Sequence, residues 1–176
     1  MEFRELIRRR RMVRNYDAER PVAREALERI AAAAQRAPSA GFSQGQRLVV
    51  VTDAEMRRAV ADVCDEPGYV AAGFDPWISR APALFIPCVS EEVYRARYRE
   101  PDKRAPGEPE MEWPVPYWWV DVGCTTMLIL LAAVDEGLAA GFLGPGKIAD
   151  VQDVLGIPSH FVPAGVITVG HPLPDR

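Results

Sequence analysis

Five arginines gather close to the N-terminus, within the segment RRRRMVRNY at residues 8–16: Arg8, Arg9, Arg10, Arg11 and Arg14. A guanidinium group is planar and always charged, and its paired N–H donors match the oxygens of a phosphate. Such a cluster could serve as a nucleic-acid arm, a membrane-surface anchor, a solvated helix face or an anion-binding site. The composition and the remaining motifs discriminate among these four uses.

The overall composition argues against a nucleic-acid partner. The chain has 176 residues, a net charge of -4, and 48% hydrophobic and 26% charged residues, which is typical of a globular protein. Nucleic-acid-binding domains are usually basic as a whole, so the arginine cluster would have to act against the field of its own protein. The length is most simply explained by one domain that spans residues 1–176.

The hydropathy pattern gives no reason to expect a membrane protein. No apolar segment follows the basic N-terminus, so it does not resemble a signal peptide. The longest apolar run, Val122–Val134, has 13 residues, whereas a bilayer-spanning helix needs ~20. Acidic residues close this run on both sides, and we expect a helix that is buried on most sides.

The cysteines and histidines point to neither a disulfide framework nor a metal site. The three cysteines are odd in number, widely spaced and without a CxxC pair: Cys64, Cys88 and Cys124. This pattern favours free thiols in a reducing cytoplasm. His160 and His171 have no second ligand at a metal-binding spacing, and neither has the context of a catalytic histidine.

Local patterns predict helices and short strands in irregular alternation. Helices are expected over residues 2–11, 19–38, 54–64, 91–100, 117–137 and 147–156. Strands are expected over residues 47–53, 83–86 or slightly beyond, 139–144 and 162–170. Proline cannot donate to a sheet ladder, so Pro87 should lie near an edge or an end of the sheet. The pattern alone leaves α+β and α/β folds open.

Two segments do not fit a regular element. Residues 66–77 are rich in turn formers and remain ambiguous. Residues 101–116 contain five prolines and few aliphatic residues, so we expect a surface excursion that acts as a lid or a mobile loop. Aromatic residues in and after this excursion could stack on a planar substrate or staple the excursion onto the next helix: Trp113, Tyr117, Trp118 and Trp119.

The segment GFLGPGKI, residues 141–148, nearly matches a nucleotide-binding P-loop. Gly141 and the Gly146-Lys147 pair satisfy the spacing, but Ile148 replaces the Ser or Thr whose hydroxyl binds magnesium. Pro145 also removes an amide from a loop that must donate amides to phosphate. We therefore do not expect a nucleoside triphosphatase.

Four other segments together resemble the nitroreductase family of FMN-dependent NAD(P)H oxidoreductases. RRMVRNY is similar to the family's opening basic motif, and APSAGFSQGQRLVVV to its APSxxNxQPWxFxVV motif. DVGCTTMLILLAAVDEGLAAGFLG resembles its long helix, Gly-Leu turn and flavin-facing strand end. LGIPSHFVPAGVITVGHP resembles its closing motif, which also begins LGIP. The four segments cover nearly the whole chain in the family's order.

This resemblance implies an α+β fold with a central, mostly antiparallel sheet flanked by helices. It also implies a homodimer whose long central helices form the interface, with FMN bound between the subunits. NADH or NADPH would be the electron donor and a small molecule the acceptor, with neither nucleic acid nor a membrane as a partner.

The same resemblance assigns cofactor-binding roles by position. Arg10, Arg11 and Arg14 would hold the flavin phosphate and the pyrimidine edge, with Met12 contributing its backbone. Other expected contacts are Pro38, Ser39 and Ala40 from the partner subunit, Leu143 and Gly144 beside the flavin N5 edge, and Arg176 at the phosphate. Ser39 could instead be an ordinary turn hydroxyl, Gly144 a turn residue and Arg176 a frayed end. Arg8 and Arg9 are expected only to solvate a helix face.

Three departures from the family pattern stand out. Met12 replaces a serine, Gly45-Gln46 replaces Pro-Trp, and Phe42 replaces an asparagine whose amide can meet the polar flavin edge. The Phe42 ring could pack as core or form a wall of the substrate cleft.

The sequence therefore predicts a hydride transfer from NAD(P)H through FMN to a planar electrophile such as a nitroaromatic or a quinone, in a ping-pong cycle. Two alternatives share the fold: a flavin-binding or sensing module with little turnover, and a specialised flavin- or deazaflavin-dependent enzyme. No side chain is expected to act as a catalytic acid or base.

Overall fold

The structure, a computed structural model, describes residues 2–144 and 149–174. Its helices are α1 (Phe3–Arg9), α2 (Arg24–Ala34), the 3-10 turn η1 (Ala40–Phe42), α3 (Ala54–Val63), α4 (Glu66–Ala71), α5 (Glu91–Tyr98), α6 (Tyr117–Asp135) and α7 (Ala149–Val154). Its strands are β1 (Gln46–Val51), β2 (Ala83–Val89), β3 (Ala139–Leu143), β4 (Val162–Pro163) and β5 (Val166–Gly170).

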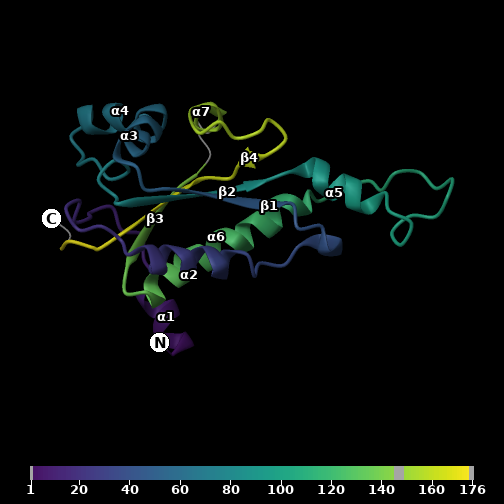
Figure 1. The fold of residues 1–176 in the computed structure, drawn as a ribbon, viewed down its shortest axis with the longest axis horizontal. Coiled ribbons are helices and arrows are strands. Elements are labelled where there is room, and N and C mark those ends of the chain that lie inside the picture. The colour runs from purple at the N-terminus through teal and green to yellow at the C-terminus, as the bar shows by residue number, and fades with distance from the viewer. Residues whose placement is uncertain (1, 145–148, 175–176) are drawn as a thin grey trace.

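The sheet is antiparallel throughout the described strands. The strand order is β1-β2-β5-β3, and β4 pairs with the end of β2. Figure 1 shows the sheet between two helical layers, with α2 and α6 on one face and α3, α4 and α7 on the other. The expected α+β fold with a mostly antiparallel, helix-flanked sheet is confirmed.

Side chains of the sheet alternate between two hydrophobic clusters. Leu84, Ile86 and Val166 pack toward α3, α4 and α7, whereas Phe85 and Ile167 pack against α2 and α6. Because successive side chains of a strand point to opposite faces, the central strands of a sheet covered on both faces are buried at every position and mostly apolar. This arrangement explains why all residues of β2 and β5 are buried.

Pro87 lies in a central strand and not at an edge of the sheet, but it is only two residues from the end of β2, so the end position is the alternative that holds. β2 is a central strand that continues to Val89. Pairing of β2 with β5 ends at Phe85, and pairing with β4 begins at Cys88. Pro87 is in the junction between these two ladders, where its carbonyl accepts the Ala164 N–H at 2.8 Å. The proline therefore removes a donor where the pairing strand changes.

The chain leaves its first helix earlier than the pattern predicted. α1 ends at Arg9, and Arg10 already has extended backbone angles (φ -62, ψ 116). The following residues run alongside β3: Met12 forms a parallel bridge with Ala140, and the Val13 N–H donates to Ala140 O at 3.1 Å. Most of the arginine motif is thus an extended segment at the sheet edge rather than a helix.

Tyr16 fixes the far end of this extended segment. Its ring is fully buried, and its Oη lies 2.7 Å from Val13 O and 2.7 Å from Thr168 Oγ1. Burial raises the pKa of the Tyr16 phenol well above its ordinary value, so the hydroxyl stays a neutral donor.

Within the apolar run Val122–Val134 only Gly123 and Met127 are exposed, so α6 is buried on most sides as expected, but one face stays exposed in the single chain. With 19 residues, α6 is long and apolar enough to span a membrane by length and composition alone. In the structure, 39% of its most apolar stretch of 18 residues is buried inside the protein. One face packs on α2 and the sheet. The opposite face exposes apolar side chains at helical spacing, including Val120 and Met127. This face is suited to a second protein surface.

The proline-rich excursion is anchored by its aromatic residue. Trp113 makes edge-on contacts with Tyr94, Tyr98 and Trp118, at centroid distances of 6.4, 4.7 and 5.4 Å. Trp113 and Trp118 therefore staple the excursion onto α5 and α6, as one of the two alternatives expected. Tyr117 and Trp119 remain exposed.

Candidate functional site

The extended arginine segment forms a cationic edge beside β3. Arg11, Met12 and Arg14 are exposed and Arg10 is partly buried. The Arg14 guanidinium lies over the Trp77 ring, 5.4 Å from its centroid. A guanidinium stacked on an aromatic face keeps its edge N–H donors available for an anion.

Trp77 is itself held firmly beneath Arg14. The buried Glu66 carboxylate accepts the backbone N–H groups of Trp77 at 2.7 Å and Ile78 at 2.5 Å. The same acid lies in the segment whose pattern was ambiguous, and this segment forms α4. Glu66 therefore supports the cationic edge indirectly, through the indole on which Arg14 lies.

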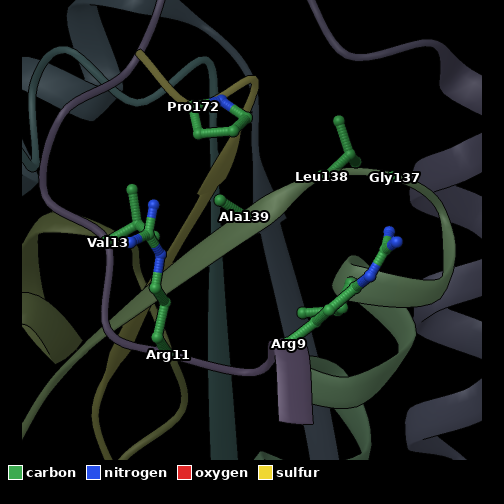
Figure 2. Close-up of a pocket in the computed structure, with 8 residues that line it drawn as sticks. Arg9, Arg11, Val13, Gly137, Leu138, Ala139 and Pro172 are labelled. Atoms are coloured by element: carbon green, nitrogen blue, oxygen red, sulfur yellow. The ribbon is translucent and has the colours of Figure 1, made fainter. Parts of the chain in front are cut away.

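A cavity of about 220 Å³ opens between the arginine segment and the turn that joins α6 to β3. Figure 2 shows the Arg9 and Arg11 side chains extending toward the same side of the chain, near Leu138 and Ala139. Two guanidinium groups with apolar walls would suit a phosphate attached to an organic group.

Arg9 is a residue whose place at this cavity was not expected. Its Nε donates to Glu5 Oε1 at 2.6 Å, and the same carboxylate also pairs with Arg8. Hydrogen bonds from these two arginines lower the pKa of Glu5 to about 2. The solvated-face interpretation fits Arg8, whereas Arg9 also lines the cavity.

The second expected group of residues surrounds η1. The Ser39 hydroxyl accepts the Gln44 N–H at 2.9 Å, so it closes a turn as one interpretation expected. Its own O–H remains a donor. Gln46 Nε2 donates to Pro38 O at 2.9 Å, and Ser43 Oγ donates to Ala40 O. The Pro38–Ala40 segment is thereby held from several sides.

Phe42 does not pack in the core. Its side chain is 74% exposed, and its backbone has a left-handed φ of 57°. Few non-glycine residues adopt this conformation, and a bulky aromatic residue is among the least suited to it. Between the two alternatives expected for Phe42, burial in the core is excluded.

Leu143 and Gly144 lie at the end of β3, farther along the strand that the cationic edge follows. Gly141, two residues before Leu143, packs closely against the arginine segment of the same chain. A Cβ there would come within 2.5 Å of Val13 O. Arg176 and the P-loop-like residues 145–148 lie outside the described residues.

The two groups of expected site residues lie at opposite ends of α6. The backbone N–H of Ala40 donates to Asp121, whereas the Arg9 and Arg11 cavity is also lined by Val134 and Gly137. Asp121 and Val134 are 13 positions apart on one helix, or ~20 Å at 1.5 Å per residue. One chain therefore does not bring both groups together.

Within residues 2–144 and 149–174, no group of three or more His, Cys, Asp or Glu side chains could hold a metal ion. The donors that the structure gathers at the cationic edge are guanidinium groups, which suit an organic phosphate.

Fold and residues define a class of protein: an α+β domain with an antiparallel sheet between two helical layers and a guanidinium-rich edge suited to a phosphate. The sequence profile of the Nitroreductase family matches residues 7–171, and the chain belongs to this family.

Individual relatives agree with this assignment. The chain is 27% identical over 171 residues to an Archaeoglobus fulgidus protein provisionally named NADH dehydrogenase/NAD(P)H nitroreductase, covering 95% of this chain and 83% of the relative. It is 28% identical to the FMN reductase [NAD(P)H] of Bacillus subtilis, and the match covers 92% of this chain and 62% of that relative. The solved structure of B. megaterium NfrA2 superposes with a TM-score of 0.76 at 25% identity. The superposition covers 97% of this chain and 66% of the NfrA2 chain.

Proposed function

We propose that this protein transfers a hydride from NADH or NADPH through FMN to a planar small-molecule electrophile such as a nitroaromatic or a quinone, in a ping-pong cycle. Membership of the nitroreductase family and the FMN reductase among its relatives support the enzyme class and the cofactor. When bound, FMN supplies the redox chemistry, accepting a hydride and passing on two electrons. The polypeptide binds, orients and shields it, and solvent supplies the protons.

The cationic edge is the phosphate and pyrimidine side of the proposed site. Arg10, Arg11 and Arg14 hold these parts of FMN, Met12 contributes its backbone, and Arg176 adds a further cation. The observation that carries this assignment is the extended segment along β3, which presents several guanidinium groups with Arg14 stacked on Trp77. A cation at the pyrimidine edge also stabilises the anionic reduced flavin.

The remaining contacts require a homodimer. Leu143 and Gly144 lie beside the reactive edge, and the partner subunit's loop supplies Pro38, Ser39 and Ala40. A two-fold pair of α6 helices, packed antiparallel through their exposed apolar faces, would bring the loop end of one chain to the cationic end of the other. The ~20 Å separation within one chain and the exposure of Val120 and Met127 support this arrangement.

Phe42 forms a wall of the substrate cleft in this proposal. Its ring lies beside the Pro38–Ala40 segment and is exposed rather than buried. An aromatic wall favours flat acceptors that can stack. We place the enzyme in the cytoplasm, because Cys64, Cys88 and Cys124 are all free thiols.

The first experiment is a visible absorption spectrum of the purified protein, followed by heat release and identification of the chromophore. We expect a yellow protein that releases about one FMN per chain. Protein stripped of flavin should bind FMN at least about tenfold more tightly than riboflavin, because riboflavin lacks the phosphate. The variants Arg10→Ala and Arg14→Ala should reduce that difference.

Steady-state oxidation of NADH and of NADPH with a quinone then tests turnover. A flavin-loaded dimer that oxidises neither nucleotide would favour the flavin-sensing alternative. A colourless protein that takes up no added FMN would contradict the cofactor assignment itself.

A further inference from the structure

Asp121 is a buried carboxylate in the first half of the largely apolar helix α6. Its side chain is on the buried face, with the residue only 6% exposed. A buried carboxylate is costly unless hydrogen bonds compensate for lost hydration. Asp121 therefore needs specific donors, and the structure shows which groups supply them.

Two donors approach the same oxygen of the Asp121 carboxylate. The backbone N–H of Ala40 donates to Asp121 Oδ2 at 2.8 Å, and the Tyr94 hydroxyl donates to the same oxygen at 2.8 Å. Tyr94 is fully buried. Its burial, and to a smaller extent its hydrogen bond to Asp121, raises the pKa of its phenol far above the ordinary value. The hydroxyl thus remains a donor at every physiological pH.

Asp121 completes the set of contacts that immobilise the Pro38–Ala40 segment. Side chains donate to the carbonyl oxygens of this region: Gln46 to Pro38, Ser43 to Ala40, and Arg97 to Gly41. The carboxylate instead binds a backbone N–H, so it fixes the peptide plane between Ser39 and Ala40 from inside the protein. The segment has only small side chains, so its position depends on how its backbone is held.

We propose that Asp121, oriented by Tyr94, is a positioning residue that sets how the Pro38–Ala40 segment meets the flavin of the neighbouring subunit. This inference rests on the proposed function, in which that segment contacts FMN. Asp121 lies on the same helix whose exposed face is the proposed dimer contact. The helix thereby fixes the loop and the subunit interface relative to each other.

The test compares isosteric and truncated variants with a matched control. Asp121→Asn and Tyr94→Phe keep the packing volume, and Asp121→Ala removes the acceptor. The control is Asp53→Ala, because Asp53 also accepts a backbone N–H, from Met56 at 2.8 Å, but caps α3 on the opposite face of the sheet. The control should lower the melting temperature and leave flavin binding unchanged.

Three measurements separate positioning from mere stability. Hydrogen exchange of the flavin-free protein should show faster exchange of peptides covering residues 38–44 in Asp121→Ala than in wild type or Asp53→Ala. Titration with FMN should give a dissociation constant raised about tenfold in Asp121→Ala, and less in Asp121→Asn and Tyr94→Phe. The visible circular dichroism of bound FMN should change in all three.

The positioning role is overturned if the Asp121 variants lose thermal stability as the control does while FMN affinity and visible circular dichroism stay at wild-type values. It is equally overturned if residues 38–44 exchange at the wild-type rate in Asp121→Ala. Failure of the proposed function looks different, because wild-type protein would then bind no FMN at all. That result would overturn both proposals.

Discussion

Phe42 holds a large apolar ring in water on a backbone conformation that its residue type disfavours. A left-handed conformation costs an ordinary L-residue ~1–2 kcal/mol, whereas asparagine tolerates it because its amide bonds locally. We expect Phe42→Asn to raise the free energy of unfolding by about 0.5–1 kcal/mol. Denaturant unfolding of the wild type and the variant measures this difference.

The matched control for this prediction is Phe42→Ala, which removes the ring but keeps a Cβ on the strained backbone. If alanine stabilises the protein as much as asparagine does, the gain comes from removing exposed apolar surface rather than from relief of backbone strain. With a quinone as acceptor, both variants should raise KM, because both remove the proposed aromatic wall.

Two of the three thiols should be unreactive in the folded protein. Burial raises the pKa of Cys64 to about 11 and that of Cys88 to about 12. At pH 8 the thiolate fraction is then roughly one in a thousand for Cys64 and ten times less for Cys88, and the thiolate is the reactive form. Mass spectrometry after iodoacetamide treatment should show both unlabelled at pH 8.

As the pH rises toward 11, while the fold persists, Cys64 should become labelled before Cys88, and in denaturant both should react readily. Fast labelling of Cys88 at pH 8 in folded protein would contradict its burial in the sheet.

At the level of single residues, the resemblance pointed to the arginines as candidates but not to the groups that support them. The sequence pattern identified Asp121 only as the boundary of an apolar run. A lone acid between Val120 and Val122 could have indicated a buried carboxylate with specific hydrogen-bond donors. Its bond to Ala40 spans 81 positions along the chain, and local patterns carry no information about such a partner. Glu66 went unnoticed for the same reason, because it binds backbone groups of residues 77–79.

At the level of elements, the extended arginine segment and β3 lie so close that only glycine fits between them at one position. A Cβ on Gly141 would lie 2.5 Å from Val13 O and 2.9 Å from the Trp77 ring. The backbone oxygen cannot move without displacing the segment. We expect Gly141→Ala to destabilise the protein by about 1–3 kcal/mol, measured by denaturant unfolding, and to weaken FMN binding.

Gly73→Ala provides the comparison. Apart from the adjacent residues, no described atom lies within 4 Å of a Cβ placed at Gly73, but its φ of 91° makes any side chain there strained. It should lower stability without altering FMN affinity. Equal loss of FMN affinity in both variants would show that the contact with Val13 does not matter for the site.

Most elements follow from sequence periodicity, and the misplacements have physical causes. The helix predicted over residues 2–11 ends at Arg9 because Val13 and Tyr16 are drawn into sheet-edge contacts that residue patterns do not encode. Pro87 is tolerated in a central strand because two different strands share one side of β2. The predicted strand over residues 162–170 is divided into β4 and β5 at the same junction.

At the level of the whole molecule, the exposed apolar face of α6 should govern both assembly and flavin binding. Met127→Glu places a charge at the centre of this face, where burial against a second helix would be costly. We expect sedimentation to shift from dimer to monomer and bound FMN to be lost. The control is Met56→Glu. In the wild type, Met56 lies on α3 in the other helical layer and is exposed to a similar extent as Met127.

Retention of the dimer by Met127→Glu would exclude this face as the interface. A monomer that still binds FMN with wild-type affinity would show that one chain forms the whole site, contrary to the separation seen along α6.

In the proposed dimer, the length of α6 would also make each flavin the joint property of two chains. A chain defective at the cationic edge and a chain defective in the 38–42 loop carry damage in different halves, so neither homodimer has an intact site. When the two are unfolded and refolded together, each mixed dimer regains one undamaged site and one doubly damaged site. Activity should therefore reappear from two inactive parents, at up to about one quarter of the wild-type level if chains pair at random.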